Sequence, residues 1–307
     1  MPSQNPEPNQ AEDALTRLSD ALAARTAAAA GLVASVHVPH SRPRSGILWR
    51  RDVIIASEQV FPKTEAVEIV VADGRRIAAK VAGRDRGTNV VALRLDAPVD
   101  VALPAAAEPQ LGAITLALGA GPSGAPIARL GVVRSLGPAW HSLAGGHIDR
   151  RITLDFLIGR AAEGGPVLDA SGRLLGMSTG GPGGRALVIP AATVERVLDP
   201  LLATGRIDRG WLGVALHPVT LPEAAKAEGD QQRGLMVMQV AQDGPAAKAG
   251  VLAGDILVAV DGAPAARPTE ISCRFGAESI GKQVELRLVR SGAPLTLTAT
   301  ITARPAE

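Results

Sequence analysis

The chain has 307 residues, 46% of them hydrophobic and 20% charged, a globular composition with enough length for two or three domains. Lys and Arg number 32 against 30 Asp and Glu, and no stretch concentrates the basic charge, so the sequence excludes an electrostatic footprint for nucleic acid. The single cysteine, Cys273, excludes an internal disulfide and a cysteine-based metal cluster.

The N-terminal segment predicts a tail followed by a helix. Residues 1–10 are rich in Pro, Asn and Gln and are expected to be disordered. Residues 11–31 form a predicted helix, because Leu15, Leu18 and Leu22 recur at helical spacing. No basic start precedes an apolar run here, and the apolar run over 26–38 is too short to span a bilayer. We therefore expect no membrane insertion and a cytoplasmic chain as written, or a periplasmic one if the N-terminus has been trimmed.

Short β-type runs begin at Leu32 and come in two series of six, separated by a connector over 97–112 that is rich in Pro and Ala. A predicted helix over 191–205 closes the second series and is stopped by Gly205. Many short strands, twice over, fit two β-barrels better than a parallel α/β sheet. A third unit, over 206–305, has five strand-like runs and two short helical segments, near 244–249 and 268–277.

Four segments carry a resemblance to a known family. They are "VADGRRIAAKVAGRD" (71–85), "EGGPVLDASGRLLGMST" (163–179), "ALVIPAATVERVLDPLLATGRIDRGWLGV" (186–214) and "GPAAKAGVLAGDILVAVDG" (244–262). In order and spacing the chain resembles an HtrA-type serine protease with one PDZ domain, from about residue 32 to 304. The resemblance implies a mainly β protein: a trypsin-like double β-barrel of two six-stranded lobes over 32–203, then a PDZ domain over 206–305.

The catalytic positions implied by this resemblance hold the wrong side chains. "ASEQVF" places Gln59 at the family's His, "TNVVAL" places Asn89 at its Asp, and "AAEGGP" places Glu163 at its Ser and Ala161 at the oxyanion-loop Gly. A serine nucleophile needs an imidazole base that a carboxylate orients, and amides do not titrate. We therefore expect a pseudoprotease with a degenerate triad and no catalytic residue.

New chemistry at Glu163 is the weaker alternative. A carboxylate nucleophile needs a second acid nearby, and the nearest candidates in sequence, Asp155 and Asp169, are expected to be strand or turn residues. The residues give little support to a metal or small ligand at Glu163, so no metal and no cofactor is expected.

The predicted PDZ unit has the residues that peptide binding requires. PDZ domains add an extended peptide to a sheet edge and capture its C-terminal carboxylate with backbone N–H groups. The resemblance places the carboxylate loop at "WLGV", and the expected peptide-binding residues are Trp211, Leu212, Gly213, Val214, Leu216 and Ile271. Of Ile271 and Phe275, one is expected to face the groove and the other the core. Because the loop itself contains no Lys or Arg, an apolar C-terminal residue is the expected ligand.

Two functions from different classes follow. The leading one is a catalytically inactive HtrA-like adaptor or chaperone-like scaffold that binds C-terminal or extended peptide segments of client proteins. The alternative is an active serine endopeptidase of the HtrA family in protein quality control. A homo-oligomer stays open; relatives of this kind form trimers through an aromatic-bearing N-terminal segment, and this chain has no aromatic residue before Trp49.

Overall fold

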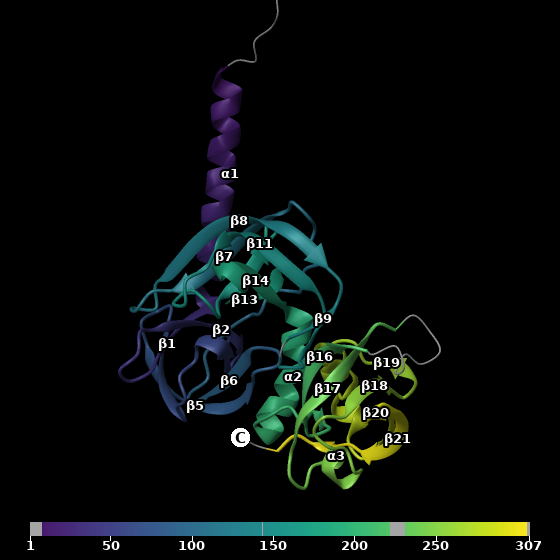
Figure 1. Ribbon diagram of the computed structural model, residues 1–307. Coiled ribbons are helices and arrows are strands. Elements are labelled where there is room, and N and C mark those ends of the chain that lie inside the picture. The colour runs from purple at the N-terminus through teal and green to yellow at the C-terminus, as the bar shows by residue number, and fades with distance from the viewer. Residues whose placement is uncertain (1–7, 143, 222–230, 306–307) are drawn as a thin grey trace, which may run out of the picture. The chain divides into compact units, whose positions relative to one another are not determined.

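The computed structural model describes residues 8–142, 144–221 and 231–305. The chain divides into two compact units: one contains the chain up to Trp140 together with His147–Arg206, and the other contains His141–Gly146 and Ile207–Glu307. In Figure 1 the first unit runs from purple to green, and the second lies in green to yellow. Among the described residues, no helix combines the length and apolar character needed to cross a membrane.

The first series of predicted strands forms a closed six-stranded barrel (Figure 1). Its spatial order is β1 (Val33–His37), β2 (Arg44–Arg50), β3 (Val53–Ser57), β6 (Val90–Leu95), β5 (Arg76–Asp85) and β4 (Ala66–Val71), and β4 closes on β1. Alternation builds it: in β5, Ile77 and Ala79 are buried while Arg76 and Lys80 are exposed. Ile54, Ile69 and Leu93 lie fully buried in its core.

The second series closes a second six-stranded barrel. Its order is β11 (Arg151–Leu157), β14 (Arg185–Pro190), β13 (Leu174–Gly180), β12 (Pro166–Asp169), β7 (Ile114–Ala120) and β8 (Pro126–Gly137), and β8 pairs back with β11. The short strands β9 (Trp140–His141) and β10 (His147–Ile148) form a separate ladder, and η3 (Pro182–Gly184) joins β13 to β14. The predicted pair of six-stranded barrels is confirmed.

Helix α2 (Ala191–Thr204) packs against β5 and β6 of the first barrel and β13 and β14 of the second, and it ends where the sequence predicts. Gly205 caps it with φ 76°, a left-handed conformation that glycine adopts without strain. The carboxylate of Glu195 accepts a hydrogen bond from the Trp49 indole at 2.5 Å, and Asp199 accepts one from Arg50 at 2.7 Å. Both contacts tie the exposed side of α2 to β2.

The N-terminal helix α1 (Pro8–Ala29) begins earlier than predicted and is followed by the 3₁₀ turn η1 (Ala30–Leu32). Residues 8–10, expected in a disordered tail, are helical, because proline's fixed φ suits the first turn of a helix. The rest of the expected tail, residues 1–7, lies outside the described residues.

The second unit is a sheet in the order β16 (Val214–Thr220), β17 (Arg233–Val240), β18 (Ile256–Val260), β20 (Gln283–Arg290) and β21 (Ala293–Thr300). The short strand β19 (Ala263–Pro264) pairs with β18, and β15 (Gly210–Trp211) pairs with β22 (Thr302–Ala303). The helices are α3 (Pro245–Lys248) and α4 (Pro268–Arg274), followed by the turn η5 (Ala277–Ser279). Leu235, Leu257 and Leu286 lie in its own hydrophobic core. This arrangement confirms the predicted PDZ-like sheet.

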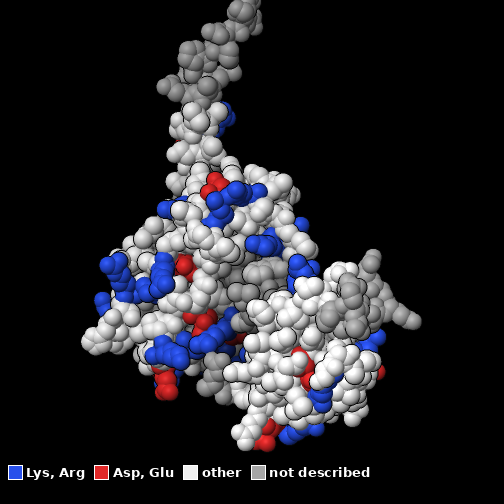
Figure 2. All heavy atoms as spheres, in the orientation of Figure 1, with Lys and Arg blue, Asp and Glu red and all other residues white. Residues whose placement is uncertain are grey.

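Charge is dispersed over the molecular surface that Figure 2 shows. Lys and Arg lie there in several separate groups, with Asp and Glu among them. Many are paired locally, as Arg75 is with Asp73 and Arg94 with Asp52.

Candidate functional site

Three side chains from distant parts of the sequence meet in the first unit. Gln59 lies in the 3₁₀ turn η2 (Glu58–Val60) that follows β3, Asn89 directly precedes β6, and Glu163 lies in the turn before β12. The Gln59 side-chain amide donates a hydrogen bond to Glu163 Oε2 at 2.7 Å, and the Gln59 backbone N–H donates to Asn89 Oδ1 at 2.7 Å. The structure therefore brings together the three residues that the sequence places at the triad positions.

Two hydroxyl groups complete this network. The Asn89 side-chain amide donates to Thr179 Oγ1 at 2.6 Å and to Ser57 Oγ at 3.0 Å. Thr179 Oγ1 also accepts from the Gln59 amide at 2.9 Å. Asn89 has φ 60°, a left-handed conformation that asparagine tolerates better than most residues. The backbone thus points the Asn89 amide into the network.

The Glu163 carboxylate is enclosed. The residue is 5% exposed, and besides Gln59 the hydroxyls of Ser57 and Thr179 lie 3.4 Å from its Oε2. A Cβ atom at Gly180 would stand 2.7 Å from Glu163 Oε1, so the absence of a side chain at 180 makes room for the carboxylate. Buried polar groups are kept where they find hydrogen-bond partners, and this carboxylate has them.

The glycines that follow Glu163 are required by packing. Gly164 has φ 96°, and a Cβ there would collide with the Ser45 carbonyl oxygen. At Gly165 a Cβ would collide with the Leu118 carbonyl oxygen. Packing therefore requires glycine at both positions of "GGP", whether or not a serine precedes them.

Ala161 adopts a backbone that suits alanine. Its φ is not among the positive values of the chain, and its carbonyl accepts hydrogen bonds from the N–H and Oγ of Ser45, at 3.1 and 2.8 Å. No left-handed strain is therefore present at this position.

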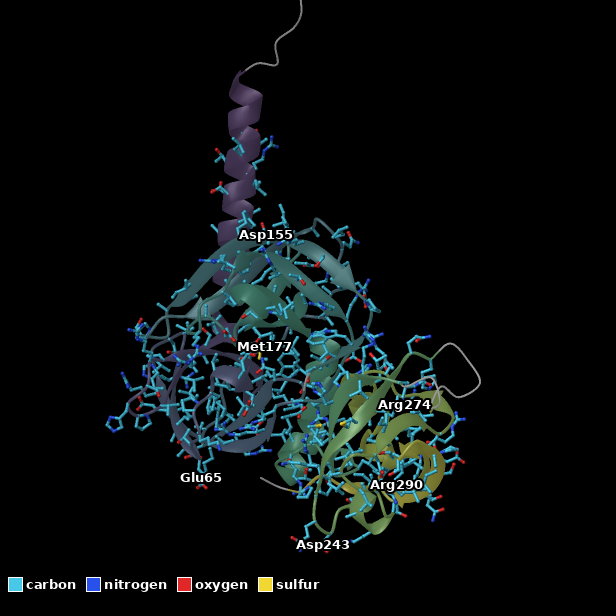
Figure 3. All side chains as sticks on the ribbon, viewed as in Figure 1. Glu65, Asp155, Met177, Asp243, Arg274 and Arg290 are labelled. Carbon is cyan, nitrogen blue, oxygen red and sulfur yellow. The ribbon has the colours of Figure 1, made fainter. Side chains whose placement is uncertain are left out.

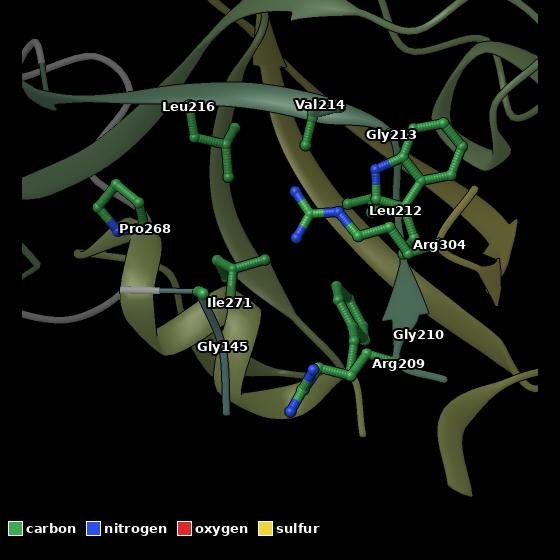
Figure 4. A pocket seen from close by; sticks show the side chains of 13 residues that line it. Gly145, Arg209, Gly210, Leu212, Gly213, Val214, Leu216, Pro268, Ile271 and Arg304 are labelled. Carbon is green, nitrogen blue, oxygen red and sulfur yellow. The ribbon is translucent and has the colours of Figure 1, made fainter. Parts of the chain in front are cut away.

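A groove in the second unit is lined by every residue that the sequence assigns to peptide binding: Trp211, Leu212, Gly213, Val214, Leu216 and Ile271 (Figure 4). It runs between β16, the edge strand of the sheet, and helix α4. Gly213 has φ 81° at the turn into β16, so the loop needs a glycine there. Phe275 corrects one expectation: Ile271 and Phe275 both line the groove and both belong to the core, each 4% exposed.

The loop before β16 presents backbone donors. The carbonyls of Leu212 and Gly213 accept from Ala246 and Ala241, at 2.9 and 2.8 Å. Among the described residues, the N–H groups of Leu212 and Gly213 donate to no backbone carbonyl. Consecutive N–H groups of this kind form a nest that suits an anion.

Two domain families match the chain: the trypsin-like peptidase domain over residues 44–177 and the PDZ domain over residues 210–301. A probable periplasmic serine endoprotease, DegP-like, from Brucella suis biovar 1 (strain 1330) is 31% identical over 281 residues, which cover 87% of this chain and 54% of that protein. The periplasmic pH-dependent serine endoprotease DegQ of Escherichia coli (strain K12) is 30% identical over 258 residues, covering 81% and 56%. The chain spans about half the length of the curated relatives it matches.

Solved structures agree on the fold. The HtrA-type protease AlgW with a decapeptide gives a TM-score of 0.74 at 22% identity and covers 93% of this chain and 99% of that one. The serine endoprotease from Yersinia pestis gives 0.72 at 24% identity, covering 93% and 98%. The chain contains a trypsin-like peptidase domain followed by a PDZ domain, and its fold is similar to that of HtrA-type proteases.

In the peptidase domain, the two other carboxylates considered from the sequence have local roles. Asp155 (Figure 3) accepts the Val132 N–H at 2.9 Å, which joins neighbouring strands β11 and β8. Asp169 accepts the N–H groups of Ser171 and Arg173 and pairs with the Arg173 guanidinium at 2.8 Å, which fixes a tight turn. Neither joins the hydrogen bonds around Glu163. In the described part of the chain, no group of three or more His, Cys, Asp or Glu side chains is placed to hold a metal ion.

In the PDZ domain, the groove is also lined by two arginines, which the sequence analysis did not predict. Arg209 precedes the carboxylate loop, and Arg304 follows β22; the pairing of β15 with β22 brings them together, and the Arg304 N–H donates to the Arg209 carbonyl at 2.9 Å. The expectation of an apolar C-terminal ligand residue considers only the absence of Lys and Arg from the loop "WLGV" itself. Only the pairing of the two ends of the domain reveals the positive charge.

Proposed function

We propose that this chain is a catalytically inactive HtrA-type protein that acts as an adaptor or chaperone-like scaffold and binds peptide segments of client proteins through its PDZ domain. One observation carries the loss of activity: the Gln59 amide donates to the Glu163 carboxylate at 2.7 Å, where a working protease has an imidazole facing a hydroxyl. An amide takes no proton at neutral pH, so Gln59 cannot serve as the general base, and position 163 offers a carboxylate where a hydroxyl nucleophile is needed.

The hydroxyl groups near Glu163 offer no substitute nucleophile. Ser57 and Thr179 approach the carboxylate but are 1% and 3% exposed, and their oxygens are engaged with the Asn89 amide. A nucleophile must reach a substrate carbonyl, which these buried oxygens do not. The Gln59 amide also donates to the Gly180 carbonyl at 2.9 Å, so the network is closed on itself.

An active serine endopeptidase is the second candidate, because the two relatives described above are serine endoproteases by name. A shared fold does not imply a shared activity when the side chains at the reacting positions differ. The side chains at 59, 89 and 163 separate the two candidates.

Peptide binding rests on the PDZ groove. Its edge strand β16, the glycine turn at Gly213 and the free N–H groups of the loop suit an added strand that ends in a carboxylate. A likeness in fold to the HtrA-type protease AlgW with a decapeptide is consistent with this use.

The test of inactivity is casein hydrolysis alongside labelling by a fluorophosphonate probe. We expect no release of casein fragments above a buffer blank and no labelled band, since no serine stands at position 163 and Ser57, the serine beside Glu163, is buried. An active HtrA-type protease serves as the positive control. Turnover that persists through repurification would favour the endopeptidase.

The test of peptide binding is a titration of the full chain with matched peptides that end in a free acid or an amide. Amidation removes the anion from the nest, and we expect it to weaken binding by about 1.5–3 kcal/mol. Equal affinity for the two forms would exclude carboxylate capture.

A further inference from the structure

The PDZ groove is apolar at its floor and cationic at its rim. Leu212, Ile271 and Phe275 are each at most 5% exposed and form the floor. The side chain of Arg304 is exposed, and Arg209 is half-buried. Among the residues that the structure describes, no acidic side chain lines the groove. The floor therefore suits an apolar group of a ligand, and the rim suits an anionic group of the same ligand.

Arg304 reaches over the groove near the carboxylate loop. Figure 4 shows its side chain extending from beside Leu212 toward the space between Val214 and Ile271. In the described part of the chain it forms no ion pair, whereas Arg290 and Arg267 of the same domain each pair with a carboxylate. Its exposed guanidinium, which carries five N–H donors, is therefore available to an anion at the mouth of the groove.

Alternation along an added strand assigns these two surfaces to successive ligand residues. With its carboxylate at the loop, a peptide paired to the edge of β16 places its last side chain on one face and its next-to-last side chain on the other. The last side chain then packs on the apolar floor. The next-to-last side chain points outward, to the rim where Arg304 lies.

From this arrangement we infer that the groove selects peptides with an apolar last residue and an acidic next-to-last residue, the acid pairing with Arg304. The inference rests on the proposed peptide binding and adds the class of sequence that is bound. Arg209 adds positive potential at the same end of the groove. Arginine suits this role because its planar fork accepts a carboxylate in a bidentate manner.

The experiment compares three fluorescent decapeptides on the full chain, identical except that the next-to-last residue is Glu, Gln or Lys before a C-terminal Val. Glu and Gln match in shape, so their difference reports charge alone. We expect the Glu peptide to bind about twofold to fivefold more tightly than the Gln peptide, the range for an ion pair at an exposed site, and the Lys peptide to bind most weakly. The preference should shrink in 500 mM salt, where the Debye length is only about 4 Å.

Substitutions locate the charge. Arg304→Gln should equalise the Glu and Gln peptides, and Arg304→Glu should make the Lys peptide the preferred one. Arg287→Gln is the matched control: Arg287 is exposed on β20 of the same domain, donates to the Gly262 carbonyl and does not line the groove. It should leave the preference intact. The salt titration of the unaltered chain tests the inference even if a variant folds poorly.

The outcomes separate this inference from the function on which it rests. Equal binding of the Glu and Gln peptides to the unaltered chain would overturn the inference and leave peptide binding standing. A gain in affinity for all three peptides in Arg304→Gln would mean that Arg304 obstructs the groove, and would also overturn it. No binding of these peptides or of a pool with randomised C-terminal residues would overturn the proposed function itself.

Discussion

At the scale of single residues, the buried Glu163 carboxylate has both a hydrogen-bond donor and the space that it needs. It accepts a hydrogen bond from Gln59, and Gly180 leaves the space that its second oxygen needs. Gln59 and Asn89 share Thr179 as an acceptor. The three residues that we propose occupy the triad positions thus form one hydrogen-bonded network, and changing any one of them alone would leave polar partners unmatched.

Restoring the triad tests whether side chains alone are missing. We expect the triple variant Gln59→His, Asn89→Asp and Glu163→Ser to stay near background, because the loop at Ala161 is held by Ser45 through both of its donors. Adding Ala161→Gly gives residue 161 access to the left-handed conformation that alanine disfavours, so the loop can turn its N–H groups; this should raise casein turnover, since a missing oxyanion donor costs about 10²- to 10³-fold in rate. Full activity in the triple variant alone would show that the loop is already competent.

Gly165 offers a sharp test of the steric reading of "GGP". A methyl group there meets the Leu118 carbonyl, so Gly165→Ala should lower the free energy of unfolding by at least about 3 kcal/mol. The matched control is Gly159→Ala in the same connection, where no atom lies within 4 Å of the added Cβ. It should change stability by no more than about 0.5 kcal/mol. Chemical denaturation measures both, and equal stabilities would refute the packing argument.

At the scale of elements, sequence periodicity is sufficient for the long strands and insufficient for the short ones. The runs "DVIIAS" and "NVVALRL" alternate or are continuously apolar and become β3 and β6, which lie next to each other in the first barrel. Strands β9, β15, β19 and β22 have two residues each and carry no periodic signal. The groove residues of "WLGV" were predictable from a motif, whereas Arg304 was not, because it enters the groove through the β15–β22 pairing across the whole domain.

Asp255 links three elements of the PDZ domain and gives a pH-dependent prediction. It precedes β18, is 2% exposed and forms a bidentate pair with Arg290 (Figure 3) at the end of β20, with both distances 2.8 Å. The Arg290 hydrogen bonds lower the pKa of the Asp255 carboxyl, and the Leu252 N–H adds to this. A lowered folded-state pKa contributes stability above the unfolded pKa, about 3.9, that is lost as pH falls through the folded value.

Asp255→Asn should therefore lower the melting temperature by a few degrees at pH 7, and the gap to the unaltered chain should narrow as the pH falls below about 4. Thermal unfolding followed by circular dichroism at a series of pH values measures the gap. Glu285→Gln, an exposed carboxylate on β20, is the control and should show no comparable gap. A gap that stays constant down to pH 2 would contradict the assignment.

At the scale of the whole molecule, the chain is two units with separate cores. The first contains both barrels and α2, and the chain passes into the main part of the second between Arg206 and Ile207. The two barrels are closed and have no free edge, whereas the PDZ sheet is open and its edge strand β16 lies beside a groove. Among the described sheets, that edge is where an added strand is expected.

Residues 206–307 should fold when produced alone, because they have their own strands and hydrophobic cluster. We expect one cooperative thermal transition and an affinity for the free-acid peptide equal to that of the full chain. Within this fragment Gly213→Val should weaken binding, because valine is strained at φ 81° and crowds the Trp211 ring. An unfolded fragment, or one that binds only in the presence of the first unit, would contradict this.

The pairing of Gly210–Trp211 with Thr302–Ala303 has a consequence for how such a domain is assembled into larger proteins. The first and last strands of the domain lie side by side, so the domain can be inserted into a loop of another protein without separating its ends. This pair of strands borders the groove, because Arg209 and Arg304 flank the pair and line the groove. Any polypeptide joined at either end of the domain therefore begins beside the end of the groove where we expect the C-terminus of a ligand to bind.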